Sequence, residues 1–339
     1  MTDTLLNSPT HEAPALENKK RGISGSTMKI IAIVTMLIDH IGAALLGRLL
    51  MQTGYMNVLQ SGDAALIEQW AKGNAGLLGT FFIMRMIGRL GFPIFCFLLV
   101  EGFQKTRNVK KYILRLGIFA LISEIPFDLA FHGTLLEFSY QNVFFTLFFG
   151  ILVMYAFQSA SEGKLPKLLQ NIFCVSGILL PSFYVLLVFQ NMLALQSVMS
   201  LAILYVVICL VFLFIVAIGG KKRGSAQAKI LCTDLTALFA AMLLADLLGT
   251  DYGGMGVFTI VFMYIFRKNK KKSMLAGCIV LCAMSLTELP AFLDMIPAAL
   301  YNGKRGLRMK YFFYAFYPGH LLLLYLIAMA MGIGGISPM

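Results

Sequence analysis

The stretch "MKIIAIVTMLIDHIGAALLG", residues 28–47, is an apolar run whose titratable side chains are Lys29, Asp39 and His40. A helix of about 20 residues spans roughly 30 Å, the thickness of the hydrocarbon core of a bilayer. An acid and an imidazole are costly at that depth and usually face a bundle interior or a water-filled cavity. The stretch therefore predicts a transmembrane helix that contributes to a buried polar site.

The composition of the whole chain agrees with this class. Of the 339 residues, 59% are hydrophobic and 13% are charged, about half the charged fraction of a soluble domain. We predict an all-α fold, a polytopic bundle of about ten membrane spans. The expected spans are residues 27–49, 77–103, 111–131, 141–158, 168–189, 195–218, 229–248, 253–266, 273–299 and 310–331.

The net charge of +12 is concentrated in short clusters between apolar runs. These clusters are "KKR" at 19–21, "KTRNVKK" at 105–111, "KKR" at 221–223 and "RKNKKK" at 267–272. This is the pattern of cytoplasmic loops rather than of a nucleic-acid-binding face. We therefore expect a cytoplasmic N-terminus, the lipid bilayer as partner, no nucleic-acid partner, and a multi-pass location in the bacterial cytoplasmic membrane. Residues 1–26 are predicted to form a disordered cytoplasmic tail, and residues 27–335 the membrane domain.

One basic segment breaks the alternation. "YNGKRGLRMK", residues 301–310, would lie outside if every predicted span crosses the membrane. Either residues 273–299 form a broken or re-entrant helix, which leaves the loop inside, or the loop is outside and its charge has a task. We favour the second interpretation.

Polar residues at membrane depth gather in one half of the bundle. Lys29 and His40 are eleven residues apart, which places them on one face of a helix about 16 Å apart in depth. Arg85 and Arg89 share a face of the second span, which Pro93 should kink, and Glu124 and Asp128 share a face of the third. Eight groups map to the outer half or the middle of the membrane and predict a single polar chamber: Asp39, His40, Arg85, Arg89, Glu124, Asp128, Asn142 and His320.

Each of these groups also has a structural interpretation. Arg85 or Arg89 could simply neutralise Glu124 or Asp128. His40 and His320 could be packing residues, although apolar surroundings would keep His40 in the neutral form that a general base needs. Adjacent helical residues point about 100° apart, so we expect Asp39 to pair with an arginine of a neighbouring span rather than with His40. We expect His132, at a loop edge, to be solvated.

Metal and disulfide chemistry find no support in the sequence. The six cysteines lie inside apolar runs without a CxxC motif, and no His/Cys cluster has metal-ligand spacing. "DYGGMG", residues 251–256, is interpreted as a close-packing turn or a backbone anion nest.

The chain resembles the TraX family. The resemblance is carried by "MKIIAIVTMLIDHIG" (28–42), the block 85–131, "YQNVFFTLFFG" (140–150), "LLGTDYGGMGV" (247–257), "YNGKRG" (301–306) and "YPGHLLLLYLI" (317–327). That family includes the conjugation protein that acetylates the N-terminus of F pilin. It is distantly similar to membrane acyltransferases with Arg or Lys, ten residues, then His in the first span, a spacing that Lys29 and His40 match. The resemblance implies acetyl-CoA as the acyl donor and His40 as the base.

These considerations give two candidate sets and several open alternatives. The predicted catalytic residues are His40, Asp39, Arg89, Glu124, Asp128, Asn142 and His320. The predicted donor-binding residues are Lys29, Arg85, Glu101, Lys105, Arg107, Lys110 and Lys111. The expected acceptor is an amine, on a peptide N-terminus such as that of pilin or on an amino sugar. The alternatives are O-acetylation of a surface glycan, proton-coupled transport through the same polar cluster, and a non-catalytic scaffold.

Overall fold

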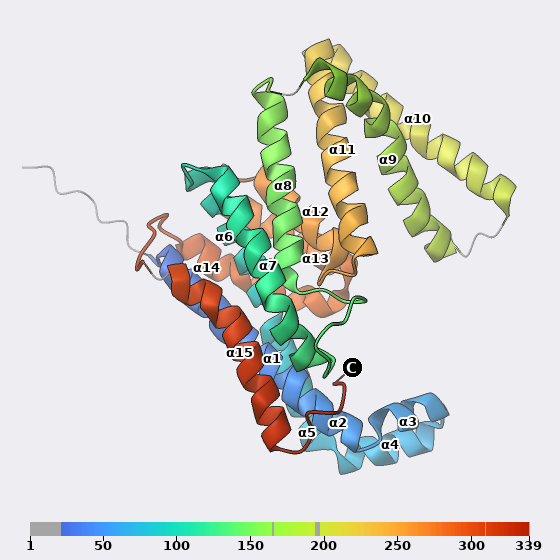
Figure 1. Cartoon of the computed structure of the whole chain (residues 1–339). Coiled ribbons are helices and arrows are strands. Elements are labelled where there is room, and N and C mark those ends of the chain that lie inside the picture. The colour runs from blue at the N-terminus through green and yellow to red at the C-terminus, as the bar shows by residue number, and fades with distance from the viewer. Residues whose placement is uncertain (1–21, 165, 194–196, 309, 339) are drawn as a thin grey trace, which may run out of the picture.

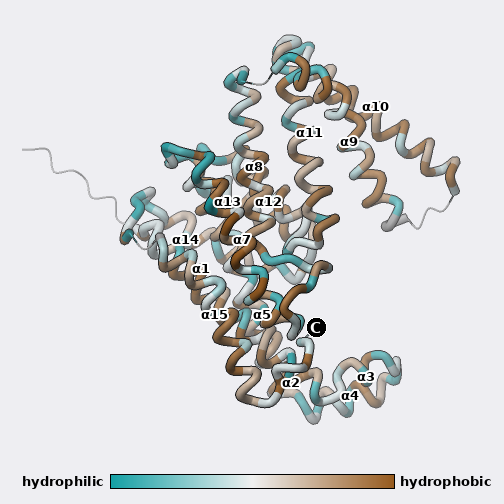
Figure 2. Tube along the Cα trace, viewed as in Figure 1, coloured by the Kyte–Doolittle hydropathy of each residue, from teal (hydrophilic) through white to brown (hydrophobic). Residues whose placement is uncertain are grey.

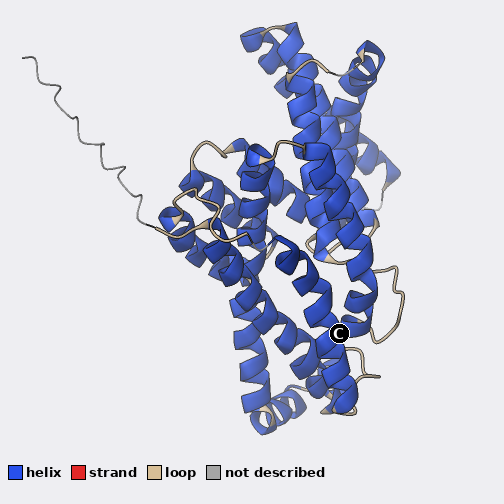
Figure 3. Ribbon diagram, turned by 60° about the vertical axis from the view of Figure 1, so that its left-hand side comes forward, coloured by secondary structure: helices blue, strands red, loops and turns tan. Residues whose placement is uncertain are grey.

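The computed structural model describes residues 22–164, 166–193, 197–308 and 310–338, and within them the chain is helical with short connections (Figure 3). The all-α class predicted from the sequence is confirmed. In chain order the elements are α1 (Gly25–Ile41), η1 (Gly42–Leu46), α2 (Gly47–Gln52), α3 (Tyr55–Ser61), α4 (Ala64–Gly73), α5 (Ala75–Gly88), α6 (Gly91–Lys105), α7 (Val109–Phe131), α8 (Val143–Ser161), α9 (Lys167–Leu193), α10 (Val198–Arg223), α11 (Ser225–Leu247), α12 (Gly253–Ile265), α13 (Lys270–Met284), η2 (Leu286–Asp294), α14 (Met295–Leu300) and α15 (Lys310–Ala330).

Among the described residues, seven helical segments are long and apolar enough to cross a membrane. They are Gly25–Gln52, Ala75–Lys105, Val143–Ser161, Lys167–Gln190, Val198–Arg223, Ser225–Leu247 and Tyr311–Ala330. Apolar residues run along the lengths of the helices, and hydrophilic residues gather at their ends (Figure 2). The chain is therefore a polytopic membrane protein.

Two further helices connect opposite faces of the bundle. α7 carries more charge than the seven segments, and α12 has only 13 residues. α7 nevertheless begins next to the basic turn after Lys105 and ends beside the outer loop that follows Phe131. α12 begins at the outer turn containing Thr250, which pairs with Gln141, and ends near Lys270 on the basic face. We count both as crossings.

Residues 273–299 do not cross, which corrects the interpretation that we favoured from the sequence. α13 ends at Met284, the chain turns through the 3₁₀ helix η2, which contains Pro290, and α14 returns to the face from which α13 started. Lys270 at the start of α13 donates to the carbonyl of Tyr301, directly after α14, at 3.2 Å. The segment is a re-entrant hairpin, the alternative that leaves the basic loop 301–308 on the inner face.

The inner end of α1 fixes that loop in place. Ile23 N–H donates to the Leu300 carbonyl at 3.0 Å, and Gly25 N–H donates to the Lys304 carbonyl at 2.8 Å. Residues 22–26, expected in the tail, are thus bound to the loop, whereas the rest of the predicted tail, residues 1–21, lies outside the described residues. The basic loop therefore obeys the positive-inside rule.

Placing the loop inside reverses the last helix. α15 runs outward beside α1 rather than inward, and the two helices lie next to each other along one side of the bundle (Figure 1). α1 also packs against α5 and α6, and α15 packs against α7. The outer halves of α1, α5, α7 and α15 consequently converge on one region, whereas α9 and α10 lie apart from it at the opposite side (Figure 1).

Candidate active site

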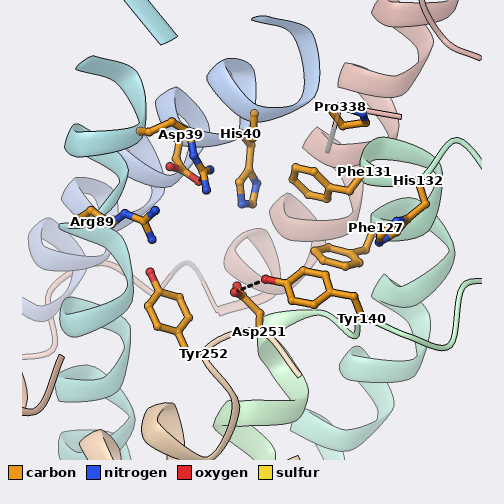
Figure 4. Close-up of a pocket in the computed structure, with 12 residues that line it drawn as sticks. Asp39, His40, Arg89, Phe127, Phe131, His132, Tyr140, Asp251, Tyr252 and Pro338 are labelled. Atoms are coloured by element: carbon orange, nitrogen blue, oxygen red, sulfur yellow. Dashed lines mark hydrogen bonds and ion pairs between the residues drawn. The ribbon is translucent and has the colours of Figure 1, made fainter. Parts of the chain in front are cut away.

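A cavity of about 350 Å³ lies in the outer half of this region. It is lined by Asp39, His40, Ala43, Arg85, Arg89, Phe127, Phe131, His132, Tyr140, Asp251, Tyr252 and Pro338. Figure 4 shows Asp39, His40 and Arg89 on one side and Tyr140, Asp251 and Tyr252 facing them across the cavity. The volume suits a small polar group or the end of a longer chain.

His40 belongs to a chain of imidazole hydrogen bonds. Nδ1 of His320 lies 2.7 Å from the Phe316 carbonyl, which can only accept, so this nitrogen carries the hydrogen. In the neutral ring Nε2 of His320 is then an acceptor, and it lies 2.7 Å from Nδ1 of His40. Nδ1 of His40 therefore donates, and Nε2 of a neutral His40 is left unprotonated.

The local backbone supports this placement. α1 is a regular α-helix as far as Ile41, and the next turn, Gly42–Leu46, is a π-helix. Single π turns are rare and are frequent at functional sites. The turn is held by Arg48, whose side chain is 0% exposed and whose Nη1 donates to the carbonyls of Ala44 and Ala130, each at 2.6 Å. Arg48 thus joins the turn after His40 to the end of α7, a role that the sequence analysis did not identify.

The two cavity arginines pair with carboxylates outside α7. Asp39 pairs with Arg85 at 2.6 Å, which confirms that Asp39 pairs with an arginine of a neighbouring span. Arg89 pairs with Glu288 of the re-entrant hairpin at 2.8 Å, and the Glu288 side chain is 1% exposed. The pairing of Arg85 or Arg89 with Glu124 or Asp128 is therefore wrong. The physical reason is the arrangement of the helices, because α1 and the hairpin, not α7, supply the carboxylates that face α5.

Arg89 is positioned by a break between helices. α5 ends at Gly88, Arg89 and Leu90 form a turn, and α6 begins at Gly91 with Pro93 in its first turn. Proline is tolerated there because first-turn N–H groups lack helical partners. The helix is thus interrupted just before Pro93, where the sequence predicted a kink, and Arg89 at the interruption lines the cavity.

Glu124, Asp128 and Asn142 do not line the cavity. The Asn142 side chain accepts from the Phe144 N–H at 3.0 Å and donates both to the Ala120 carbonyl and to Glu124. Asp128 accepts from the Glu137 N–H at 2.9 Å. These groups cap α8 and fix the loop after α7, so the expected single chamber of eight groups divides into a cavity and a neighbouring structural network.

The far wall of the cavity comes from two outer loops. Gln141 and Thr250 form a parallel bridge, and Asp251 N–H donates to the Gln141 carbonyl at 2.9 Å. Tyr140 OH donates to Asp251 Oδ1 at 2.7 Å. Burial raises the pKa of the Asp251 carboxyl, and the charge of Asp251 raises the pKa of Tyr140.

Tyr252 completes this wall with an unusual backbone. Its φ is +64°, a value that non-glycine residues seldom adopt. The ring stacks on Phe92 with centroids 3.7 Å apart, and its hydroxyl points toward Arg89 (Figure 4). The sequence analysis treated Asp251 and Tyr252 only as part of a close-packing turn or a backbone anion nest, although an aspartate beside a tyrosine between two apolar segments was an available signal.

His132 is not the solvated residue that we expected. It lines the cavity, and its Nε2 is buried without a hydrogen-bond partner among the described residues. His132 is the C-cap residue of α7, and its backbone N–H donates to the Asp128 carbonyl at 2.7 Å. The loop folds back over the helix end, which partly buries a residue that sequence position alone places at the surface.

The predicted donor-binding residues lie in three separate regions of the structure. Arg85 lies in the cavity. Lys29 lies near the inner end of α1, with Nζ 5.0 Å from the centre of the Phe313 ring. The others surround the inner turn between α6 and α7: Glu101, Lys105, Arg107, Lys110 and Lys111.

Two of those inner residues are already engaged. Lys105 Nζ donates to Glu101 at 2.6 Å, to Tyr301 OH at 3.1 Å and to the Gly303 carbonyl at 2.9 Å. This cluster joins α6 to the basic loop after α14. Arg107, Lys110 and Lys111 are exposed and leave cationic groups facing the inner side.

Known proteins similar to this chain include the members of one described family and a fimbrial assembly protein. The sequence profile of the family described as "TraX protein" matches residues 24–232 and 183–328. A curated relative from Dichelobacter nodosus, "Probable fimbrial assembly protein FimC, serogroup H1", is 32% identical over 161 residues, which are 45% of this chain and 53% of the relative. The chain thus spans about half the length of this curated relative. No solved structure matches the chain.

Proposed function

Because the chain belongs to the TraX family, we propose that it is a membrane-embedded acyltransferase that moves an acetyl group from acetyl-CoA to a nucleophile bound in the outer cavity. One observation carries this proposal: the two-histidine hydrogen-bond chain leaves Nε2 of His40 unprotonated at the wall of the cavity. A positioned base of this kind is what attack of an amine or hydroxyl on a thioester requires.

The residues of the cavity suit the individual steps. Nε2 of His40 takes a proton from the acceptor as the acceptor atom bonds to the thioester carbonyl carbon. The carbonyl oxygen gains negative charge, and the N–H groups of Arg85 and Arg89 that their carboxylate partners leave free stabilise it. The carbon–sulfur bond then breaks, and the CoA sulfur receives the proton.

Positive groups on the inner face suit the donor. Arg107, Lys110 and Lys111 are exposed at the turn between α6 and α7, where they favour the phosphates of a CoA molecule from the cytoplasm. Lys29 lies further along α1 toward His40. The packed residues between Lys29 and His40 include the buried Ala32 and Met36, so delivery of the acetyl group to the cavity requires α1 and its neighbours to separate.

The family and the fimbrial relative support a pilus subunit as acceptor. The corresponding location is the bacterial cytoplasmic membrane, with the cavity open to the outer face. The catalytic roles of His40, Arg85 and Arg89 and the use of acetyl-CoA all belong to this proposal.

Substitution of His40 by alanine tests the proposal directly. We expect His40→Ala to lower acetyl transfer by about 10²–10⁴-fold, the usual contribution of general-base catalysis. The measurement is mass spectrometry of pilin and other surface material from cells expressing either form, scored for the mass of one acetyl group. A folded His40→Ala protein with full transfer would contradict the scheme, as would wild-type protein that never consumes acetyl-CoA.

A further inference from the structure

The charges lining the cavity do not balance. Arg85 is paired with Asp39, and Arg89 is paired with Glu288. Asp251 is the remaining carboxylate on the cavity wall, and no lysine or arginine of the described residues forms an ion pair with it. With neutral histidines and all three carboxyl groups ionised, the two guanidinium groups face three carboxylates, and the cavity with its flanking pairs has an excess of one negative charge.

The backbone holds Asp251 independently of its side chain. Its N–H donates to the Gln141 carbonyl at 2.9 Å, and its own carbonyl accepts from the hydroxyl of Thr146. The side chain accepts from Tyr140 OH at Oδ1, at 2.7 Å, and its charged form is also stabilised by the backbone N–H of Tyr252. Neither of these donors is a cation, and the carboxylate faces the cavity (Figure 4).

A carboxylate in this position favours a cation in the cavity. Burial raises the pKa of Asp251, while the Tyr140 hydrogen bond and the more distant arginines oppose that effect. An ammonium group in contact with the Asp251 carboxylate would stabilise its ionised form and make a charge-assisted hydrogen bond. A hydroxyl would gain only a neutral hydrogen bond and would leave the excess charge uncompensated.

We propose that Asp251 binds the ammonium group of the acceptor and thereby selects primary amines over alcohols. This inference rests on the proposed acetyl transfer and names the residue that recognises the acceptor. Figure 4 shows Asp251 and His40 facing the same space from opposite walls. An ammonium group between them would contact the Asp251 carboxylate on one side and the His40 imidazole, which acts as its base, on the other.

The resulting reaction is balanced. The acceptor enters as R–NH₃⁺, and His40 Nε2 removes one proton to give R–NH₂. The amine nitrogen bonds to the thioester carbonyl carbon, the carbon–sulfur bond breaks, and the second nitrogen proton goes to the CoA sulfur. The products are an acetamide, CoA thiol and protonated His40, which returns its proton to water.

The test uses the full-length protein in lipid nanodiscs with three small probes: n-butylamine, n-butanol and butyltrimethylammonium. The variant is Asp251→Asn, and the matched control is Glu137→Gln, an acidic residue of the same outer loops that does not line the cavity. Release of CoA thiol from acetyl-CoA measures transfer. The shift in Tm caused by butyltrimethylammonium, which cannot be acetylated, measures cation binding separately.

We expect wild-type protein to use butylamine in preference to butanol and to be stabilised by butyltrimethylammonium. Asp251→Asn should raise the KM for butylamine by about tenfold or more and abolish the Tm shift. Glu137→Gln should retain both properties. Asp251→Glu keeps the negative charge and should recover part of the amine preference, which separates a charge effect from a folding defect.

The outcomes distinguish this inference from the function on which it rests. Transfer with an unchanged amine KM and an unchanged Tm shift in Asp251→Asn would overturn the role of Asp251 and leave acetyl transfer standing. A wild-type Tm shift that Asp251→Asn loses, without any CoA release, would support the cation site and overturn acetyl transfer. Wild-type protein that shows neither response would overturn both.

Discussion

At the scale of single residues, the site depends on which nitrogen of His40 carries the hydrogen. Many hydrolases fix this tautomer with a carboxylate, whereas here a second imidazole, fixed in turn by the Phe316 carbonyl, does so. Asp39, although adjacent to His40 in sequence, is occupied by Arg85. In the proposed mechanism His320 is therefore a positioning residue, and its removal should act on the rate rather than on binding.

We expect His320→Leu to lower kcat for acetyl transfer by about fivefold, because one hydrogen bond of roughly 1 kcal/mol no longer selects the reactive tautomer. KM should stay unchanged. His320→Gln offers an amide oxygen to Nδ1 of His40 and should recover part of the rate. A folded leucine variant with full kcat would show that His320 has only a packing role.

Residue chemistry was more predictable from the sequence than residue partners. The titratable groups of the first two spans were recognised by their depth. Four of them line the cavity: Asp39, His40, Arg85 and Arg89. The partners were not predictable, because Arg89 meets Glu288 and His40 meets His320 across 199 and 280 residues of sequence. Helical periodicity specifies a face of one helix but does not specify which distant helix covers that face.

At the scale of secondary-structure elements, the close approach of α1 and α5 depends on Gly88. A Cβ at Gly88 would overlap the side chain of Asp39, which leaves no room for any larger residue. The glycine thus allows the Asp39–Arg85 pair to form between two helices in contact. Small residues have this function at many helix interfaces in membranes.

Gly88→Ala should therefore destabilise the protein by about 1–3 kcal/mol, as is usual for overpacking, and should also reduce transfer by displacing Asp39. Thermal unfolding in nanodiscs measures the first effect. Gly79→Ala is the matched control on the same helix, since its Cβ would meet nothing within 4 Å. Equal Tm values for the two variants would contradict the close contact.

The re-entrant hairpin shows where reasoning from hydropathy fails. Residues 273–299 are long enough for a span, yet Glu288, Pro290 and Asp294 interrupt them. The sequence offered both interpretations. The backbone contacts of Tyr301 and Leu300 decide between them, and such contacts between distant loops leave no periodic signal in the chain.

At the scale of the whole molecule, the hairpin places every strongly basic loop on one face and leaves the cavity near the other. The topology can be checked by labelling with a membrane-impermeant maleimide, in a background where the six native cysteines are replaced. Lys304→Cys should react only from the inner face, with inverted membranes. Leu135→Cys, at a position 65% exposed in the outer loop, should react from the outer face of intact cells. Labelling of Lys304→Cys in intact cells would refute the hairpin.

The hydrogen bond between His40 and His320 joins the first long helix to the last. During synthesis, a nascent chain that ends before residue 320 already holds His40 in the membrane but has no acceptor for its Nδ1. The reactive tautomer is thus selected only after nearly all of the described helices have been inserted. A truncated or misassembled chain would hold His40 without this orientation, so that the proposed base would become competent only at the end of biogenesis.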